Sequence, residues 1–405
     1  MSLCMFDERA IQGIAPSRVE VCGDLATFAN AVWRCASAGE VIADYGMGHR
    51  GLGARPPAGH VQIDPPAGVI EHYVPDMAVR VAAGTKLGDL QTALAGQRQF
   101  LPIDGHPAMT IGEIVTHNVS GALRIGSGSV RDLLLGLRYI DSEGQVITVG
   151  GRTVKNVAGY DVTRLMVGSL NMLGLPVEVT LRTAAVPPQV TQVEVDAVDP
   201  VAFSEAMTDL LVSEAAPWSL EWEHVNTMGQ LRPNVLRFGY AGTMLTCRTQ
   251  VRALRDWFQR HDWWLGGDLP ARDVTPAQDQ QERAARWAWR QSATVVGKLI
   301  VPPAATGKFI DVLLHLEVPP PMVQALPSHG IIHFGAGWPV DRTLEIDELL
   351  LEKLRQVEGM RVWLRRPAHD LRIAPFAPEQ PDWALLVRLK QAMDPSGLFN
   401  PERFP

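Results

Sequence analysis

Three glycine-containing loops in the first part of the chain constrain its fold more than any other feature. They read YGMGHRGLGARP (45–56), DGHPAMTIGEIVTHNVSGALRIGSGSVRD (104–132) and GGRTVKNVAGYDVTRLMVGSLNMLG (150–174). Glycine allows positive φ and lets a ligand approach the backbone closely. Successive N–H groups in such turns form a concave anion site. A turn followed by a surface loop explains any one of them. The alternative is a large polar ligand that lies against the backbone, for which a pyrophosphate is the natural group.

Two common nucleotide-binding motifs do not fit these loops. None has the form G-x-G-x-x-G after a strand with an acidic residue about 20 positions further on, so a Rossmann site is a poor interpretation. None ends in the Gly-Lys-Ser/Thr of a P-loop, so an ATP site is equally poor.

The composition sets the class of protein. With 405 residues the chain is too long for one ordinary core, so we expect two domains. Hydrophobic residues make up 46% and charged residues 20%, which is typical of a globular protein. The net charge of -7 argues against nonspecific nucleic-acid binding, which needs a basic face. The four cysteines are scattered without a CxxC pair, so we expect neither an iron–sulfur cluster nor a structural zinc.

The N-terminus and the longest apolar run bear on location. The start MSLCMFDERAIQG carries acidic residues and no apolar segment, unlike a secretory signal. The run LMVGSLNMLGLPVEV is interrupted by Ser169, Asn171 and Pro176 and falls short of the ~20 residues that span a bilayer. We therefore expect a cytoplasmic protein, or one that is peripheral to the inner membrane through a partner.

Short strands are predicted for the first part of the chain. The turn Asp141–Gly144 joins two of them as a hairpin, and a glycine ends an amphipathic helix at 87–94. The stretch VRDLLLGLRYID mixes helical and strand signals. The predicted strands span 61–64, 69–73, 78–83, 134–141 and 145–149.

Beyond Pro187-Pro188 the aromatic content rises and the glycine content falls. Alternating strands and helices with short connections indicate an α+β sheet backed by helices. The predicted strands span 190–198, 220–225, 235–240, 295–301 and 331–334. The predicted helices span 200–214, 245–261, 276–290, 308–316, 345–358 and 381–393.

The order of the three loops resembles the FAD-binding domain of the vanillyl-alcohol-oxidase and p-cresol-methylhydroxylase (PCMH) type. The first loop is similar to that family's pyrophosphate loop, and VPDMAVRVAAGTKLGDLQTAL to its strand, Ala-Gly turn and helix. Within the family, GGRTVKNVAGYDVTRLMVGSL most resembles the FAD-binding E subunit of glycolate oxidase (glycolate dehydrogenase). The ending MDPSGLFNPERFP resembles the family's C-terminal return, so the resemblance covers almost the whole chain.

The resemblance implies an α+β fold with a two-subdomain FAD-binding domain of the PCMH type at 1–186. An α+β cap domain with an antiparallel sheet, for substrate or subunit contact, would follow at 187–368, and 369–405 would return to the FAD domain. It also implies non-covalent FAD, with a covalent bond through His49 as the alternative. The residues it assigns to FAD binding are Gly46, Met47, Gly48, His49, Arg50, Thr110, Ile111, Gly112, Glu113, Asn118, Ser120, Gly121, Lys155, Asn156, Gly159, Tyr160 and Asp161.

The chain departs from the family pattern at three places. Glu113 stands where the family usually has glycine, and a carboxylate beside a pyrophosphate is repulsive. Asn171-Met172 replaces the usual Gly-Thr, which removes a hydroxyl donor, although Asn tolerates positive φ well. Pro176 is unexpected at the start of a strand because proline cannot donate to the ladder.

The resemblance implies an FAD-dependent oxidoreductase that acts on CH-OH groups. Glycolate would be oxidised to glyoxylate by hydride transfer to the flavin, and an iron–sulfur partner subunit would take the electrons. A second, D-type flavoprotein subunit would complete the complex. A non-catalytic assembly or electron-relay subunit with weakened flavin binding is one alternative, and a stand-alone FAD-dependent hydroxy-acid or alcohol oxidase is another. No spacing identifies a catalytic base.

Several other side chains are candidates for functional roles. His329 and His333 are expected on one face of a strand, because their separation is even, but two histidines do not make a metal site. His106 and His117 are expected to make structural hydrogen bonds. Asp161 is equally well explained as a helix cap. Trp287 and Trp289 are expected in the core or at a subunit contact, and Arg365-Arg366 on the surface or facing a carboxylate substrate.

Overall fold

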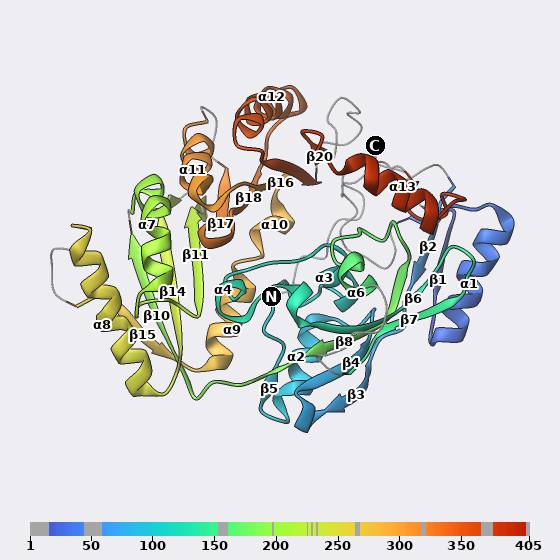
Figure 1. The fold of residues 1–405 in the computed structure, drawn as a ribbon, viewed down its shortest axis with the longest axis horizontal. Helices are drawn as coiled ribbons and strands as arrows, with labels where there is room; N and C mark the ends of the chain where they lie inside the picture. Colours follow the sequence, from blue (N-terminus) through green and yellow to red (C-terminus); the bar gives the residue numbers. More distant parts are fainter. Residues whose placement is uncertain are drawn as a thin grey trace.

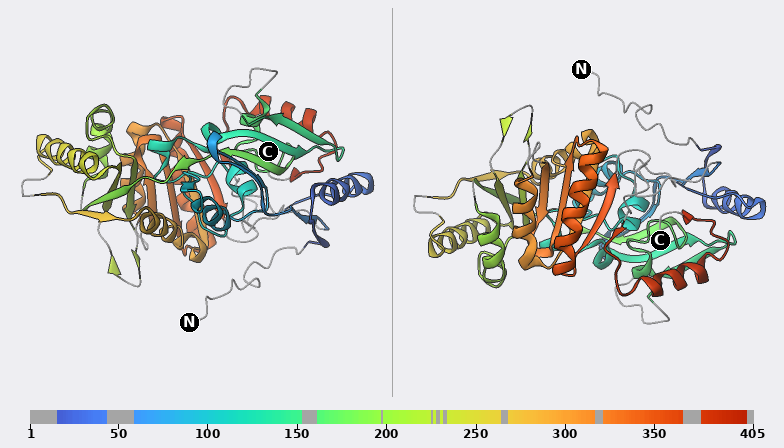
Figure 2. Two further views of the ribbon diagram at one scale, coloured as in Figure 1. Left: turned by 90° about the horizontal axis from the view of Figure 1, so that it is seen from below. Right: turned by 90° about the horizontal axis from the view of Figure 1, so that it is seen from above.

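A computed structural model of the chain describes residues 16–43, 59–152, 161–196, 198–224, 226–227, 230–231, 234–263, 268–316, 321–365 and 376–401. The described part of the chain forms two main sheets that lie side by side, one from each half of the sequence (Figures 1 and 2). Within the described part, no helix is both long enough and apolar enough to cross a membrane.

The first half is built on a five-stranded antiparallel sheet of order β3-β4-β8-β6-β7. A short parallel pair, β1 and β2, lies beside it. The elements are β1 (Arg18–Val21), α1 (Leu25–Ala38), β2 (Val61–Asp64), β3 (Val69–Tyr73), η1 (Val74–Asp76), β4 (Ala78–Ala82), α2 (Leu87–Ala95), β5 (Gln99–Phe100), α3 (Ile111–Thr116), α4 (Arg124–Ser127), α5 (Val130–Leu133), β6 (Leu134–Ile140), β7 (Val146–Gly150), α6 (Val162–Met166), β8 (Leu175–Arg182) and β9 (Ala184–Ala185).

All five strands predicted for this half are present, and the Asp141–Gly144 turn joins β6 to β7. The ambiguous stretch VRDLLLGLRYID contains both a helix and a strand, because helix α5 leads directly into strand β6. Pro176 lies inside β8, a central strand. It sits where the pairing of β8 with β6 is irregular and beyond the last residue that β4 pairs. The missing N–H therefore costs no regular ladder bond, as bulges allow.

Helix α1 was not predicted from the sequence. Asp24 caps its N-terminus by accepting from the Thr27 amide, and Gly39 ends it at a φ of 66°. Its buried face packs with β2 and the C-terminal residues in a separate cluster. The main core of this half packs β4, β6 and β8 against α2 and α3.

The second half forms a nine-stranded antiparallel sheet of order β15-β10-β14-β11-β17-β18-β16-β19-β20. The elements are β10 (Gln189–Asp196), α7 (Pro200–Val212), β11 (Ser219–His224), β12 (Asn226–Thr227), β13 (Gln230–Leu231), β14 (Val235–Gly242), α8 (Met244–Arg260), β15 (Ala271–Val274), α9 (Pro276–Ala285), α10 (Trp289–Ser292), β16 (Val295–Ile300), η2 (Pro303–Ala305), α11 (Thr306–Leu314), β17 (Met322–Leu326), η3 (Pro327–His329), β18 (Ile331–Ala336), α12 (Val340–Gln356), β19 (Met360–Arg365), β20 (Phe376–Ala377) and α13 (Trp383–Met393).

One face of this sheet is apolar and packs on helices α7, α8, α11 and α12 (Figures 1 and 2). Its side chains include the fully buried Trp222, Phe238 and Phe334. The other face is turned toward the first half of the chain and carries polar residues. The α+β class with a second, antiparallel sheet is thereby confirmed, while the predicted domain boundaries stay predictions.

Three sequence-based expectations for this half need correction. The helix expected at 276–290 ends at Ala285, and a turn separates it from α10. The helix expected from residue 345 begins at Val340. His329 is not on a strand with His333, because it lies in the 3-10 turn η3, which Gly330 ends at a φ of 64° before β18 starts.

Candidate functional site

The central segment begins with helix α3, whose cap explains Glu113. The hydroxyl of Thr110 accepts from the Glu113 amide at 3.2 Å, and the Glu113 carboxylate accepts from the Thr110 amide at 3.3 Å. This reciprocal capping box satisfies two otherwise open donors. Glu113 is only 2% exposed. Its carboxylate therefore serves the helix end, which resolves the departure from glycine noted in the sequence.

Two glycines of this segment are required by packing against the protein itself. A Cβ on Gly112 would lie 3.1 Å from the Ala83 side chain, and the Gly112 amide donates to the Ala83 carbonyl at 2.8 Å. A Cβ on Gly121 would overlap the side chain of Asp104. Close backbone approach is thus needed here, as the glycines indicated, but the neighbours are protein atoms.

Two segments far apart in sequence meet at a buried polar surface that we call the cradle, residues 115–120 and 168–172. The Gly168 amide donates to the Val115 carbonyl at 3.0 Å, and the Leu170 amide to the Thr116 carbonyl at 2.9 Å. The backbone of Asn118, Leu170 and Asn171 has positive φ, at 48°, 53° and 59°. Such strain in residues other than glycine persists where the surroundings enforce it, often at functional sites.

The cradle holds buried polar atoms without hydrogen-bond partners. They are Asn118 Oδ1, Ser169 Oγ and both amide atoms of Asn171, a residue that is 0% exposed. Leaving such groups unsatisfied is costly, so each such group needs an explanation. Such unsatisfied donors and acceptors fit a large polar ligand such as a flavin with its ribityl chain.

The remaining predicted cofactor contacts divide into two groups. Asp161 is exposed and caps helix α6 by accepting from the Arg164 amide at 3.2 Å, so a capping role is present. Ser120 Oγ accepts from Arg124 at 2.6 Å. The predictions that lie outside the described residues are Gly46, Met47, Gly48, His49, Arg50, Lys155, Asn156, Gly159 and Tyr160.

A row of residues on the polar face of the second sheet lies next to the cradle. Strand register places Val362, Lys298, His333, Gln324 and Glu223 opposite one another across β19, β16, β18, β17 and β11. Directly opposed residues share a face of the sheet. Val362 packs with Leu170 and Met172 in one apolar cluster. This cluster joins the row to residues 168–172 of the cradle, which we call the cradle loop.

Lys298 is buried and lies near two cations, Arg124 and Arg290. Burial, with smaller contributions from Arg124 and Arg290, lowers the pKa of Lys298 to about 8. Among residues with described positions, no carboxylate pairs with its ammonium group. A lysine with a cationic neighbourhood and no acidic partner is a ready site for a carboxylate ligand.

His333 stays neutral at physiological pH for a similar reason. Burial lowers the pKa of His333 well below its usual value, and Arg290 and Lys298 lower it further. The Trp287 ring lies 6.2 Å from the His333 ring and carries the Arg290 guanidinium stacked at 3.6 Å. Burial, with a smaller contribution from Arg124, likewise lowers the pKa of His329 to about 4. Trp287 and Trp289 are buried, which confirms their expected place in the core.

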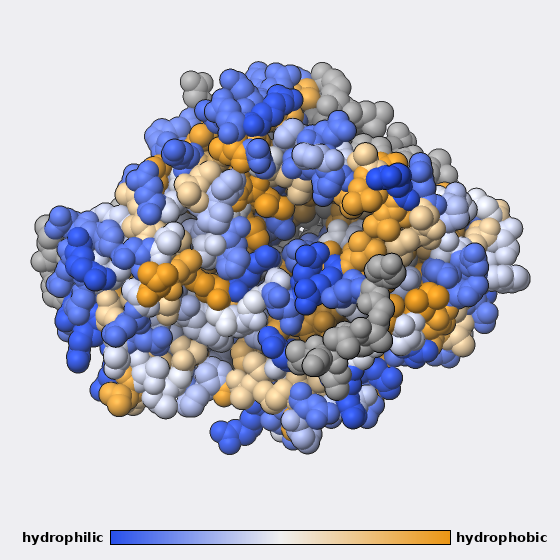
Figure 3. Space-filling view, viewed as in Figure 1, coloured by the Kyte–Doolittle hydropathy of each residue, from blue (hydrophilic) through white to orange (hydrophobic). Residues whose placement is uncertain are grey.

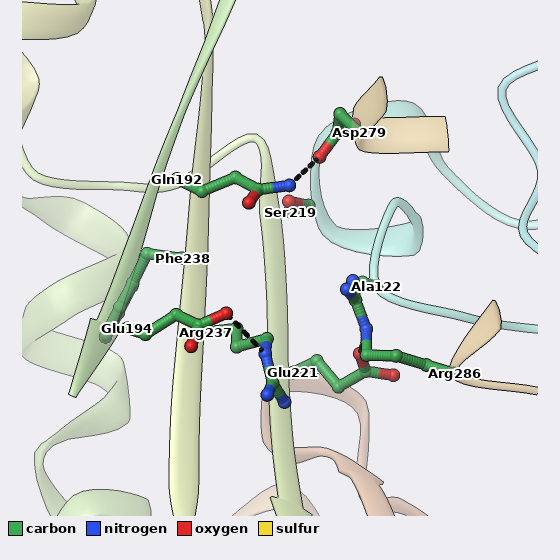
Figure 4. A pocket seen from close by; sticks show the side chains of 9 residues that line it. All are labelled: Ala122, Gln192, Glu194, Ser219, Glu221, Arg237, Phe238, Asp279 and Arg286. Carbon is green, nitrogen blue, oxygen red and sulfur yellow. Dashed lines mark hydrogen bonds and ion pairs between the residues drawn. The ribbon is translucent and has the colours of Figure 1, made fainter. Parts of the chain in front are cut away.

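A charged network fixes the far end of this row (Figure 4). Glu221, which Figure 4 shows beside Arg286, accepts from Arg286 at 2.8 Å. It also accepts from the side-chain amide of Gln324. The pKa of Glu223 is raised by burial and by the neighbouring Glu221. A polar cavity between this network and helix α9 is lined by Ala122, Gln192, Glu194, Ser219, Glu221, Arg237, Phe238, Asp279 and Arg286.

A buried ion pair ties the two halves together. Arg283 of α9 donates to Asp104 at 2.7 Å, and the second oxygen of Asp104 accepts from the Leu123 amide at 2.7 Å. Arg283 also pairs with Asp279. Because Arg283 is 5% exposed and Asp104 is 6% exposed, this pair holds the second sheet in a fixed position over the central segment. A surface recess opens between the two halves (Figure 3).

Sequence reasoning missed Lys298 and Arg290 and treated His333 only as a metal-ligand candidate. The one available signal was a single lysine inside the apolar strand VVGKLI. His106 and His117 make local hydrogen bonds, as expected. In the described ranges, no group of three His, Cys, Asp or Glu side chains is placed to hold a metal ion.

Comparison with known proteins agrees with this geometry. Residues 16–163 match the FAD binding domain family. The chain is 28% identical over 340 residues to the glycolate oxidase subunit GlcE of Escherichia coli, which covers 83% of this chain and 84% of that protein. It is 36% identical over 115 residues to a mitochondrial D-lactate dehydrogenase (cytochrome) of Arabidopsis thaliana, which covers 28% of this chain and 20% of the relative.

The fold comparison covers nearly the whole chain. A solved alkyldihydroxyacetonephosphate synthase superimposes with a TM-score of 0.64 over 95% of this chain and 76% of that one, at 13% identity. This likeness confirms the overall fold. The family match confirms FAD as the cofactor that the loops predicted. The chain is therefore an FAD-linked oxidoreductase that carries this family's FAD-binding domain, and along most of its length it is similar to a glycolate oxidase subunit.

Proposed function

We propose that the chain oxidises a small 2-hydroxy acid, glycolate to glyoxylate, as the FAD-binding subunit of a glycolate oxidase complex. The observation that carries the proposal is Lys298, a lysine among cations that shares a sheet face with Val362, which packs on the cradle loop. A carboxylate is the functional group that such a lysine binds best. The similarity to GlcE supports glycolate as the first substrate to test.

The residues of the chain have separate tasks in this proposal. Lys298 binds the substrate carboxylate and thereby orients the C2 carbon toward the cradle. His333, which is neutral, hydrogen-bonds the substrate 2-hydroxyl and can receive its proton. Trp287, Val362 and Met172 exclude water from the space between sheet and cradle.

FAD, when bound, supplies the hydride acceptor. In the described part of the chain, FAD would be held by the cradle, including Asn171, and by the rest of the Thr110–Gly121 segment. Gly46 to Arg50 would hold the pyrophosphate, with Lys155, Asn156, Gly159 and Tyr160 at the last segment. The bond is proposed to be non-covalent.

The electrons must leave the chain. The cysteines form no cluster motif, so an iron–sulfur subunit is proposed to accept them, with a D-type flavoprotein subunit as a further partner. The names of two relatives, the glycolate oxidase subunits GlcE and GlcD, support a multisubunit complex.

The first test is the visible spectrum of the purified chain, before and after acid precipitation. Yellow protein that releases FAD into the supernatant supports a non-covalent site, and colour that stays in the pellet points to His49. Anaerobic addition of glycolate should then bleach the flavin, with acetate as a matched carboxylate that lacks the hydroxyl. Colourless protein that takes up no added FAD would refute the proposal for the isolated chain and favour an assembly subunit.

A further inference from the structure

The cradle loop has a strained backbone, and its conformation depends on contacts with other parts of the chain. Leu170 and Asn171 are consecutive residues with positive φ, at 53° and 59°. Each costs about 1–2 kcal/mol for a residue other than glycine. Within the cradle, the Leu170 amide donates to the Thr116 carbonyl and the Met172 amide to the Ser169 carbonyl, at 2.9 Å each. Further contacts are needed to keep this conformation.

Those contacts come from the C-terminal strap, residues 390–400. The Lys390 ammonium donates to the Met172 carbonyl at 2.8 Å and to the Phe399 carbonyl at 2.7 Å. It also pairs with Asp394. The Asn400 side chain donates to the Asn171 carbonyl at 3.4 Å. The carbonyls of Asn171 and of the following Met172 are therefore both bonded by residues more than two hundred positions away in sequence.

The strap is itself anchored. Asp394 is 2% exposed and accepts from the amides of Leu398 and Phe399 at 2.9 Å each. The Ile42 amide donates to the Leu398 carbonyl at 2.8 Å, and the Asn400 amide to the Ile42 carbonyl at 3.0 Å. These bonds fix the strap on the first half of the chain, so Lys390 meets Met172 from a rigid support.

We infer that Lys390, assisted by Asn400, is a positioning residue of the cofactor site, which holds the Leu170–Met172 loop so that the buried Asn171 amide faces the flavin. The inference rests on the proposed placement of FAD at the cradle. Asn171 supplies the observation that points to a ligand, since both of its amide atoms are buried and without a partner. If the loop could relax from its strained conformation, the Asn171 side-chain amide would no longer face the flavin.

Such a role makes strap docking and cofactor binding mutually dependent, because coupling between two sites is reciprocal. Loss of the strap contacts weakens FAD binding, and FAD binding in turn protects the strap. A residue that only stabilises the fold would show neither effect once global stability is accounted for.

The test measures FAD affinity of the apoprotein by the change in flavin fluorescence on titration. Lys390→Met should raise the Kd at least about tenfold, the size of one charge-assisted hydrogen bond. Lys390→Arg, which keeps the charge, should recover most of the loss. Asn400→Gly keeps the backbone at its φ of 43° but removes the side-chain bond, and should give a smaller rise.

Two controls separate positioning from stability. Arg388→Met changes an exposed residue of the same helix. Arg361→Met breaks a buried bond to Asp347 on the apolar side of β19 and lowers stability without touching the cradle. Neither should alter the Kd for FAD. Hydrogen exchange at the Leu398 and Phe399 amides should slow on FAD binding in the wild-type protein and not in Lys390→Met.

Tight FAD binding by the wild type with an unchanged Kd in Lys390→Met would overturn this inference alone. An equal rise in Arg361→Met would overturn it too, because the effect would then be general destabilisation. Wild-type apoprotein that takes up no FAD would overturn the proposed cofactor placement, and this inference with it.

Discussion

Replacement of Lys298 by methionine should change function and stability in opposite directions. Methionine keeps the length of the side chain and its apolar stem but removes the ammonium group. If Lys298 binds the substrate carboxylate, a charge-assisted bond worth about 1.5–3 kcal/mol is lost. That corresponds to a fall of roughly 10- to 150-fold in kcat/KM.

The free energy of unfolding should rise in the same variant. Burial lowers the pKa of Lys298 from 10.5 to about 8. At pH 7 the folded protein keeps the lysine charged at a cost of about 3 kcal/mol, since one pKa unit is 1.36 kcal/mol. Between pH 8 and 10.5 the unfolded chain retains a proton that the folded protein has lost, so stability rises with pH across this window. Lys298→Met should be more stable at pH 7 and lack that rise.

The pH dependence of activity gives an independent check. Above pH 8 the ammonium loses its proton and the carboxylate loses its partner. In the wild type, kcat/KM should therefore fall about tenfold per pH unit above that point. Steady-state kinetics from pH 6 to 10 and urea unfolding at pH 7 and 9 measure both effects.

The matched control is Lys308→Met, an exposed lysine on α11. It should change neither kcat/KM nor the free energy of unfolding by a measurable amount. The reasoning is refuted if Lys298→Met is less stable than the wild type at pH 7, or if its kcat/KM is unchanged.

Three further substitutions test the rest of the site. Arg283→Met leaves Asp104 and Asp279 buried without their cation and should lower the free energy of unfolding by about 3–5 kcal/mol in urea. Glu113→Gln keeps the reciprocal cap and should leave the Kd for FAD within twofold. If Glu113 instead repelled the pyrophosphate, its replacement would make FAD bind more tightly. Spectroscopic titration with FAD distinguishes the two results. Gly121→Ala should cost about 1–3 kcal/mol of stability in thermal unfolding, because its methyl group overlaps Asp104.

Local signals in the sequence predicted most elements correctly. Alternating apolar residues placed the strands, and VRDLLLGLRYID was ambiguous because a helix and a strand meet there without a linker. Helix α1 was missed, although Asp24 and Gly39 mark its ends. The family pattern led us to expect that Glu113 repels the cofactor pyrophosphate. The spacing Thr110-x-x-Glu113 is itself the pattern of a capping box, which explains Glu113.

The proposed substrate site could not be read from the sequence in the same way. Lys298, inside an apolar strand, is indistinguishable locally from a lysine that reaches solvent by its long stem. The proposed role of Lys298 follows from the strand register, which places Lys298 opposite His333 on one side and Val362 on the other. Periodicity predicts that a strand exists but not which residue of another strand lies opposite it.

The two halves of the chain therefore contribute different kinds of unfavourable feature to the proposed site. The cradle contributes strained backbone and unsatisfied polar atoms, which Lys390 and Asn400 hold in place from the C-terminal strap. The second sheet contributes Lys298, a buried ammonium group without a carboxylate partner, and the Asp104–Arg283 pair fixes this sheet over the cradle. Because both features are unfavourable in the free protein, each needs its own anchor, and a bound cofactor and substrate would relieve both. A substitution that improves stability at Lys298 and one that lowers it at Lys390 should for this reason both reduce function.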